Sequence, residues 1–445
     1  MADHAQPQHT HDEDGPDFLT EDDVLEVEEL EAEGDAPMSD DDEGAEGDEQ
    51  DMHDDDDDEG RDDAMDMLDN GLDDSMCTTS LHRSASSSQD PAAVFALSLH
   101  PFTSLLAVSG GEDDQAFIFR TDTGAQVAHL SGHSDSVTCA GFSHDGALCA
   151  TAGMDGRVRV WRVRRRGADE AWEECGWELA VALEGPDEVN WIDWHPKGNV
   201  LVAGGADGTV WVWNLPRGDT MHVLAGHTAS VTAGRFTPDG KKILTASEDS
   251  TLILWDPRTG SPLWKLTSDD ARFSLDGGIN ALAINPASTV AILGGAAGSI
   301  RAVNLVKGEV LAQLEGHEDG ASVEAVAFNE VPTVATTSGG GASVQVIVSV
   351  GTDGRVCTWE ANGFKLRSTG SHEDAVTSLS FSPHTPTFLT GSADKTLKLW
   401  DYRTGTCLKT LLGNRDVVHA VAVSRDGRVA VSGSEDGTVR TFRLD

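Results

Sequence analysis

The sequence predicts an all-β fold, an eight-bladed β-propeller that follows a disordered acidic tail. Three observations support this prediction: a turn-and-aromatic motif that recurs along the chain, strong hairpin signals between short apolar runs, and the lack of convincing helical periodicity. Short strands at even spacing indicate a ring of small sheets, because radial repetition leaves only short, protected sheet edges.

Negative charge is concentrated at the start of the chain. The 445 residues include 77 acidic and 31 basic side chains, a formal charge of −46, and residues 1–75 hold 34 acidic residues against one basic residue, Arg61. Such a segment cannot bury enough apolar surface to offset its ordering entropy. We therefore expect residues 1–75 to be a disordered tail and residues 76–445 to fold. The overall charge argues against direct binding to nucleic acid.

Several protein classes are excluded. The sequence has no apolar stretch of about 18 residues and no basic-then-apolar leader, so we expect neither a membrane span nor a secretory signal. The cysteines lack the CxxC pairs of zinc and redox sites, and no P-loop is present, so we expect no metal and no cofactor. We also expect a monomer. We expect a cytoplasmic protein, with the nucleus as the alternative. One basic cluster suits a nuclear signal, a contact for the tail or a solvated loop: Arg162, Arg164, Arg165 and Arg166.

The repeat fixes the number of blades. The turn residue and the aromatic residue stand six positions apart at Asp113/Phe119, Asp155/Trp161, Asp207/Trp213, Asp249/Trp255, Asp353/Trp359, Asp394/Trp400 and Asp436/Phe442. One further unit is degenerate, with Ala297 and Val303 at these positions. The aromatic positions are separated by 42, 52, 42, 48, 56, 41 and 42 residues, which predicts eight units with three insertions.

The pattern of each unit predicts short strands joined by tight turns. In the second unit we expect strands over 137–143, 148–153 and 157–162, with turns at Asp145-Gly146 and Asp155-Gly156. Asp-Gly between β-branched runs is a strong hairpin signal. It recurs at Asp145, Asp155, Asp207, Asp239, Asp353, Asp426 and Asp436.

These units resemble the WD-repeat family. Three units follow a Gly-His pair and two end in Trp-Asp: Gly132-His133, Gly226-His227, Gly316-His317, Trp255-Asp256 and Trp400-Asp401. The resemblance implies that each blade takes its outermost strand from the neighbouring repeat. The last unit ends at Asp445 without a fourth strand, so we expect residues 76–82 to supply it and close the ring, with His82 in the place of the Gly-His histidine.

Two sets of side chains carry the residue types of a nucleophilic triad. They are His227, Ser247 and Asp249, followed by Trp255, and His372, Ser392 and Asp394, followed by Trp400. A base oriented by a carboxylate beside a hydroxyl suits catalysis. The resemblance implies instead a buried structural tetrad that connects turn to strands, and near-repetition in several blades favours this interpretation. We therefore expect no enzyme activity.

The expected binding surface is an acidic rim. In a propeller, the turns that hold the repeated Asp and the loops from each outer strand to the next inner strand lie on one rim, where function resides. Besides the architectural Asp residues, this rim collects Glu112, Asp135, Glu188, Glu248, Asp319, Glu324, Asp374, Asp416 and Glu435. Such a rim attracts and orients a basic segment. Trp191 is either an arginine-stacking residue or a core residue.

A closer resemblance suggests a role. The runs at 110–117, 132–145 and 191–196 and the acidic-apolar run at 23–30 look like the angio-associated migratory cell protein family. The fungal counterpart of that family is a ribosome-assembly chaperone, which implies here a propeller that holds the basic N-terminal segment of a new large-subunit ribosomal protein and supports 60S assembly.

Two alternatives stay open. Trp255-Asp256-Pro257-Arg258 and Trp400-Asp401-Tyr402-Arg403 resemble the WDxR box of substrate receptors of cullin-type ubiquitin ligases. A cell-migration or chromatin scaffold would also use an acidic rim. The tail either adds negative charge around the rim or keeps the protein soluble.

Overall fold

The computed structural model describes residues 76–82, 92–164, 170–332, 343–382 and 385–444. The described residues all belong to one compact unit. The tail expected over residues 1–75 lies outside the described residues. Within the described part of the chain, no helix is long and apolar enough to cross a membrane.

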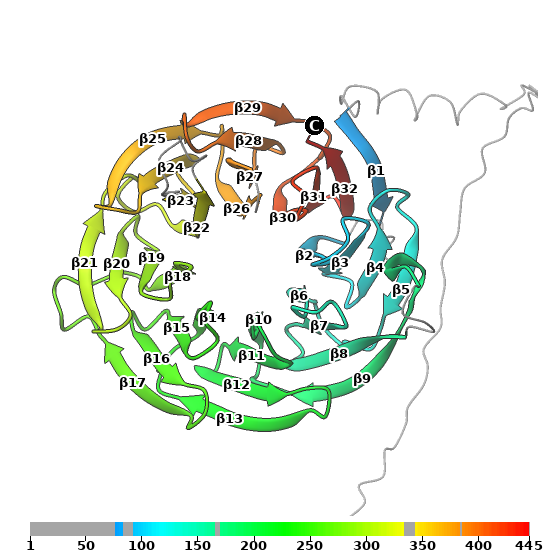
Figure 1. The fold of residues 1–445 in the computed structure, drawn as a ribbon, viewed down its shortest axis with the longest axis horizontal. Helices are drawn as coiled ribbons and strands as arrows, with labels where there is room; N and C mark the ends of the chain where they lie inside the picture. The colour runs from blue at the N-terminus through cyan, green and yellow to red at the C-terminus, as the bar shows by residue number, and fades with distance from the viewer. Residues whose placement is uncertain (1–75, 83–91, 165–169, 333–342, 383–384, 445) are drawn as a thin grey trace, which may run out of the picture. The chain divides into compact units, whose positions relative to one another are not determined.

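Eight four-stranded antiparallel sheets surround a central opening, which confirms the predicted eight-bladed propeller (Figure 1). We number the blades in chain order. Blade 1 comprises β2 (Val94–Leu99), β3 (Leu106–Gly111), β4 (Ala116–Arg120) and β5 (Gln126–Leu130). Blade 2 comprises β6 (Cys139–Phe142), β7 (Leu148–Ala152), β8 (Arg157–Arg164) and β9 (Gly176–Glu184), with a short 3₁₀ helix, η2 (Trp172–Glu174), before β9. Blade 3 comprises β10 (Val189–Trp194), β11 (Val200–Gly205), β12 (Thr209–Asn214) and β13 (Asp219–Ala225).

The other blades repeat this plan. Blade 4 comprises β14 (Val231–Phe236), β15 (Ile243–Ser247), β16 (Leu252–Asp256) and β17 (Ser261–Leu266), and blade 5 comprises β18 (Ile279–Ile284), β19 (Val290–Gly295), β20 (Ile300–Asn304) and β21 (Glu309–Leu314). Blade 6 comprises β22 (Val323–Pro332), β23 (Ser343–Gly351), β24 (Arg355–Glu360) and β25 (Lys365–Ser371). Blade 7 comprises β26 (Val376–Phe381), β27 (Thr387–Ser392), β28 (Leu397–Asp401) and β29 (Thr406–Leu411). Blade 8 comprises β30 (Val418–Val423), β31 (Val429–Ser434), β32 (Thr438–Arg443) and β1 (Cys77–His82).

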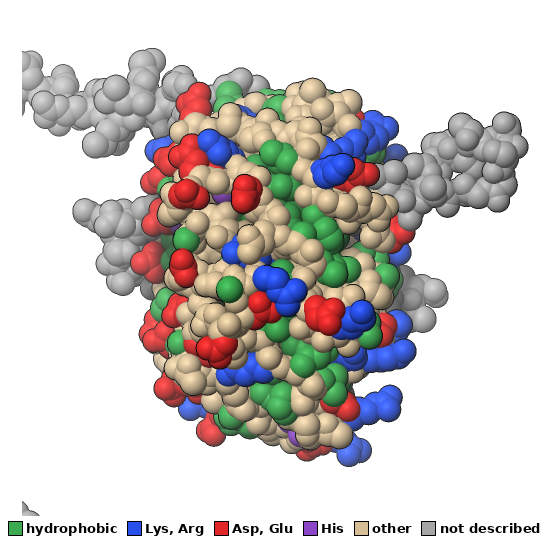
Figure 2. Space-filling model, turned by 90° about the vertical axis from the view of Figure 1, so that its left-hand side faces the viewer, with side chains coloured by type: hydrophobic (Ala, Val, Ile, Leu, Met, Phe, Trp, Pro, Cys, Tyr) green, Lys and Arg blue, Asp and Glu red, His purple; other side chains and the backbone are tan. Residues whose placement is uncertain are grey.

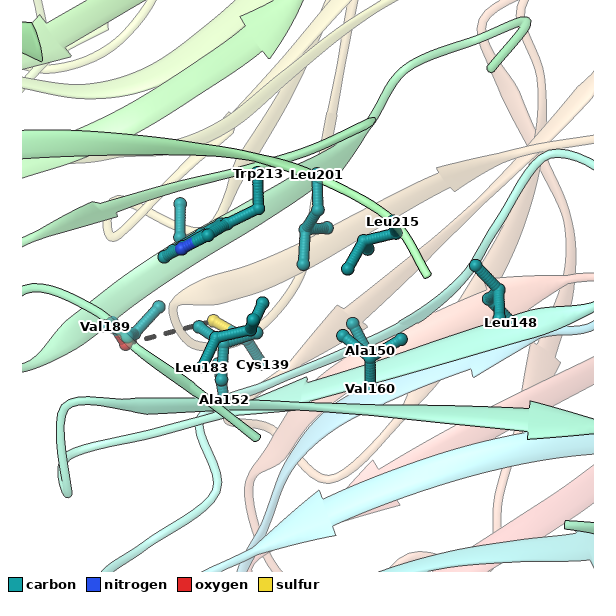
Figure 3. Close-up of a cluster of buried hydrophobic side chains, with 12 residues drawn as sticks. Cys139, Leu148, Ala150, Ala152, Val160, Leu183, Val189, Leu201, Trp213 and Leu215 are labelled. Atoms are coloured by element: carbon teal, nitrogen blue, oxygen red, sulfur yellow. Dashed lines mark hydrogen bonds between the residues drawn. The ribbon is translucent and has the colours of Figure 1, made fainter. Parts of the chain in front are cut away.

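The hydrophobic core lies between neighbouring blades. Trp213 and Leu201 of blade 3 face Ala150 and Val160 of blade 2, and all four side chains are buried (Figure 3). In the degenerate unit, Val303 fills the aromatic position and is fully buried. The recurring aromatic position is therefore a core position, which explains its period.

The ring is closed by a strand from the start of the folded part. β1 pairs antiparallel with β32, with Cys77 opposite Phe442 and His82 opposite Thr438. The Thr79 hydroxyl also donates to the Thr121 carbonyl of blade 1 at 2.7 Å. β1 therefore connects the last blade to the first, as the repeat predicts. The side chain of His82, expected to replace the Gly-His histidine, lies outside the described residues.

Candidate functional site

One end of the ring is held together by the same backbone hydrogen bond in every blade. An amide in the turn between the second and third strands donates to a carbonyl in the loop that leads into the first strand. The eight pairs, 2.8–3.1 Å apart, are Glu112–Ala93, Met154–Ser136, Ala206–Glu188, Glu248–Ser230, Ala296–Gly278, Thr352–Ser322, Ala393–Ala375 and Glu435–Val417. We call this end, formed by these turns and loops, the upper rim. Its backbone is fixed, so the side chains that it carries have defined positions.

Most of the predicted rim carboxylates occupy this upper rim and face solvent. Glu112, Glu248 and Glu435 lie in the turns, and their own amides make the repeated bond. Five predicted residues lie in the loops: Asp135, Glu188, Asp319, Asp374 and Asp416. All eight side chains are exposed except that of Asp416, which is half-buried. Glu324 is also exposed but lies on β22, where it lines the central channel.

Local hydrogen bonds orient several of these carboxylates. Asp135, Asp374 and Asp416 each accept from the amide of the next residue, at 2.8, 2.7 and 3.0 Å. Glu112 accepts from the Ala93 amide at 3.2 Å. Each of these bonds uses one carboxylate oxygen, so the second oxygen of each group can accept from a ligand.

Basic side chains near the upper rim are turned toward protein oxygen atoms. Arg159, Lys265 and Lys398 donate to the carbonyls that precede three Gly-His or Ser-His histidines, namely those of Gly132, Gly226 and Ser371. Arg355 does the same at Gly316 and also pairs with Glu318. Lys395 lies 3.7 Å from Asp416. Because these basic side chains are engaged with protein oxygen atoms, the exposed charges of the rim are predominantly acidic. The sequence pattern does not reveal these contacts.

The opposite end of the ring carries many basic side chains together with acidic ones. It is formed by the turns between first and second strands and between third and fourth strands. Its basic residues include Lys197, Arg217, Lys241, Lys242, Arg258, Lys307, Arg403, Arg425 and Arg428. Seen from the side, acidic side chains gather along one edge of the ring and basic side chains along the other (Figure 2). Acidic side chains therefore predominate along one edge of the ring in this view.

Four blades contain a buried tetrad of histidine, hydroxyl, aspartate and tryptophan. In blade 2, His133 contacts Asp155 and the Thr151 hydroxyl, both at 2.9 Å, and Trp161 donates to that hydroxyl. Blade 6 repeats the arrangement with His317, Asp353, Ser349 and Trp359. The other two sets are those proposed from the sequence, in blades 4 and 7.

The structure corrects the hydroxyl in these two sets. In blade 4, His227 Nε2 contacts Thr245 Oγ1 at 2.7 Å, not Ser247, and Trp255 donates to the same oxygen at 2.8 Å. Ser247 instead donates to the Ala229 carbonyl and accepts from the amide of Asp249.

Blade 7 requires the same correction. His372 Nε2 contacts Thr390 Oγ1 at 2.7 Å, and Trp400 donates to that oxygen. Ser392 donates to the Ala375 carbonyl and accepts from the amide of Asp394. Ser247 and Ser392 therefore stabilise the turns, and neither lies next to a histidine nitrogen as a nucleophile would.

The hydrogen bonds define the protonation of these histidines. Because the tryptophan N–H can only donate, the shared hydroxyl donates its own proton to histidine Nε2. Nδ1 then carries the proton and donates to the aspartate at 2.8 Å for His372 and Asp394, whereas His227 Nδ1 contacts the Thr251 hydroxyl at 2.8 Å, which in turn donates to Asp249. Burial lowers the pKa of His227 to about 4, which suits this neutral form.

Trp191, one of the predicted binding residues, belongs to the core. It is 8% exposed, and its indole N–H donates to the Val231 carbonyl of blade 4 at 3.1 Å. A side chain added at Gly204 or Gly234 would meet the indole within 2.5 Å, so only glycine fits there. The ring is packed between blades 3 and 4, which leaves no open face for stacking against a ligand.

The remaining predicted basic motifs lie away from the upper rim. Arg162 and Arg164 both contact Glu178, and the other two arginines of that cluster lie outside the described residues. Arg403 forms a bidentate pair with Asp401 in its own turn. Arg258 lies in the equivalent turn of blade 4. Among the described residues, no group of three or more His, Cys, Asp or Glu side chains is arranged to hold a metal ion.

Comparisons with known proteins agree with this architecture. The WD domain, G-beta repeat model matches residues 124–162, 177–214, 218–256, 363–401 and 405–443. The ribosome assembly protein SQT1 of Saccharomyces cerevisiae is 25% identical over 316 residues, 65% of this chain and 68% of that protein. The structure of Chaetomium thermophilum Sqt1 bound to the N-terminus of the ribosomal protein L10 superposes with a TM-score of 0.71 at 25% identity, covering 80% of this chain and 98% of that chain.

A more similar sequence is angio-associated migratory cell protein of Homo sapiens. It is 33% identical over 374 residues, which cover 84% of this chain and 80% of the human protein. The recurring tetrads, the eight blades and this similarity agree, and the chain belongs to the WD-repeat family of angio-associated migratory cell protein.

Proposed function

We propose that the upper rim binds the basic N-terminal segment of a newly made large-subunit ribosomal protein and holds it until it joins the 60S particle. The observation that carries this proposal is the ring of exposed carboxylates on a fixed backbone, on a propeller similar to one bound to the N-terminus of ribosomal protein L10.

Electrostatics supports this function. A ribosomal protein segment that normally contacts RNA phosphates carries unpaired positive charge before assembly and associates with any polyanion. Exposed carboxylates on one face capture such a segment quickly, because complementary potentials steer encounter. Exposed ion pairs are individually weak, so the segment can be released to RNA, which has a far higher charge density. For this mechanism we expect the protein to be found where ribosomal proteins are made, in the cytoplasm.

The proposed activity is binding without catalysis. The histidine, hydroxyl and aspartate groups that resemble a triad are fully occupied by each other and by a tryptophan N–H. A hydroxyl that donates to histidine and accepts from indole is held inside the blade, where a substrate carbonyl has no access. The tetrads therefore rigidify the blades that present the rim.

The test is calorimetric titration of the full-length protein with a synthetic peptide of the first 20 or so residues of the L10 protein from the same organism. We expect one site per chain and an affinity that falls at least about tenfold between 50 and 300 mM salt, as screening weakens contacts between exposed charges. A scrambled peptide of equal charge is the control. Absence of binding at 50 mM salt, or equal affinity for the scrambled peptide, would contradict the proposal.

A pull-down from ribosome-stripped lysate separates this function from the alternatives. We expect one free ribosomal protein to be retained at low salt and released at high salt. Retention of a ubiquitin-ligase adaptor that is lost in Arg258→Ala and Arg403→Ala variants would favour the ligase-receptor function instead.

A further inference from the structure

Each inner strand directs one side chain toward the mouth of the central channel. In seven blades the pairing of the first and second strands shifts by one residue after the buried first position, for example between Val323 and Ala325. The extra residue is a β-bulge, which re-aims its side chain. The residues at this position are Phe95, Asn190, Thr232, Asn280, Glu324, Thr377 and His419, and Thr138 takes the equivalent place in blade 2.

Most of these side chains connect neighbouring blades. Thr138, Thr232 and Thr377 each donate to the carbonyl of the first inner-strand residue of the next blade. Asn190 makes the equivalent bond to blade 4, and Asn280 Nδ2 donates to Ser322 of blade 6 at 2.8 Å. These five side chains are therefore engaged in contacts within the ring itself.

Two further positions contact each other across the junction of blades 8 and 1. The rings of Phe95 and His419 lie 5.5 Å apart, and His419 contacts Glu435. These contacts leave Glu324 as the polar bulge residue whose side chain makes no hydrogen bond or ion pair within the described part of the chain. A carboxylate cannot donate, so it cannot form the bond that threonine and asparagine make here.

Glu324 lines a cavity of about 360 Å³ within the channel, together with Thr232, Asn280 and Arg235. Because Asn280 uses its Nδ2 for Ser322, its Oδ1 remains an acceptor beside the carboxylate. Glu324 and Asn280 therefore offer acceptors in this cavity, whose lining also includes the Arg235 guanidinium and the Asp193 carboxylate. We propose that Glu324 and Asn280 Oδ1 bind the guanidinium of one arginine of the basic segment, which inserts into the channel while its neighbours contact the upper rim.

The same cavity holds a second pair of charged side chains beyond its mouth. Arg235 follows Thr232 by three residues on β14, about 10 Å further along the channel, and its guanidinium is exposed. Asp193 lines the same cavity and interacts electrostatically with Arg235, so a carboxylate accompanies this positive charge beyond the mouth. Arginine suits the mouth better than lysine, because its planar fork donates to a carboxylate and a neighbouring amide oxygen at once.

This inference rests on the proposed function, and its first test uses the same L10 peptide. Glu324→Gln keeps the shape and removes the charge, and Glu373→Gln is the matched control, since Glu373 is an exposed carboxylate on the rim loop between blades 6 and 7. We expect Glu324→Gln to weaken binding about tenfold and Glu373→Gln threefold or less. Each peptide arginine is then replaced by lysine, one at a time, and the affinity for both proteins is measured. One of these replacements should weaken binding to the wild type and leave binding to the Glu324→Gln variant unchanged.

A second probe works even if the L10 peptide is not the ligand. The wild-type protein should bind hexa-arginine at least about threefold more tightly than hexalysine, and Glu324→Gln should abolish that preference while Glu373→Gln retains it. Equal effects of the two substitutions, or an arginine preference that survives Glu324→Gln, would overturn the inference. Loss of L10 binding alongside a Glu324-dependent arginine preference would refute the proposed function and leave the channel site standing.

Discussion

The Thr245 hydroxyl serves two buried partners at once, the His227 ring and the Trp255 indole. Ser247, two residues further on the same face of β15, holds the turn instead. Strand alternation places both hydroxyls on one side of the sheet, so sequence spacing does not distinguish them. The position of the indole N–H, set by the packing of β16, selects Thr245.

Removing these hydroxyls should therefore have different costs. Thr245→Val leaves both the indole N–H and His227 Nε2 without a partner in the core, which should lower the free energy of unfolding by about 2 kcal/mol or more. Ser247→Ala should cost about 1 kcal/mol, because the turn residues that lose their partner, Ala229 and Asp249, are only partly buried. Urea denaturation of both variants measures the difference. A larger loss for Ser247→Ala would contradict the assigned tetrad.

Acid should destabilise the ring through its buried histidines. Burial lowers the pKa of His227 to about 4 from an ordinary value of 6.5. Between these values the unfolded chain binds the proton and the folded chain does not, so stability is complete above pH 6.5 and falls as the pH drops toward 4.

Asp249 adds a second acid-sensitive contribution below that window. Burial opposes its ionisation, but the Thr251 hydroxyl and the Thr228 amide hold the pKa of Asp249 at about 2. Its stabilising effect is present above the ordinary value of 3.8 and is lost as the pH falls toward 2.

Thermal melts of the wild type and of His227→Gln between pH 7.5 and 4 test the histidine effect. The variant should lose less stability on acidification, by up to roughly 3 kcal/mol. Burial also raises the pKa of Asp193 to about 6, and this shift changes the stability in the opposite direction as the pH falls. Asp193 is present in both proteins, so the difference between their pH profiles reports on His227. Parallel pH profiles would contradict the neutral, buried histidine.

At the scale of elements, closure depends on β1. This strand completes blade 8 along β32 and bonds to blade 1 through Thr79. Without it, the β32 edge and the fully buried Phe442 would meet solvent. A propeller avoids exposed edges by closing its ring, so the loss affects the whole molecule.

Deleting residues 1–82 should lower the melting temperature by at least roughly 10 °C compared with deleting residues 1–70. The shorter deletion is the control, because it keeps β1. Differential scanning calorimetry of both truncations makes the comparison, and equal melting temperatures would show that β1 does not stabilise the ring.

The repeat pattern predicts the elements well because core positions impose it. A period near 42 residues and Asp-Gly turns locate all eight blades, including the one that carries Val303. The bulges that aim Glu324 and His419 into the channel mouth were not predicted, because a bulge depends on pairing with the second strand. The directions of Arg159, Lys265 and Lys398 were also missed, since long flexible side chains find their partners only in the folded ring.

For the whole molecule, charge separation is the property that links structure to function. The upper rim fixes carboxylates through one hydrogen bond repeated in eight blades, while the basic side chains beside it are bound to carbonyls. The opposite end carries most of the turns that hold arginine or lysine, several of them paired with carboxylates (Figure 2). A cationic segment should therefore approach one end only.

The most direct measurement compares two triple charge reversals in calorimetric titrations with the L10 N-terminal peptide. Glu112, Glu248 and Glu435 on the upper rim are changed to Lys in one variant, and Asp219, Glu309 and Glu360 at the opposite end in the other. Both variants change the net charge equally. The upper-rim variant should lose at least roughly a hundredfold in affinity with an unchanged circular dichroism spectrum, and the control should bind within about threefold of wild type. Equal affinities for the two variants would contradict the account.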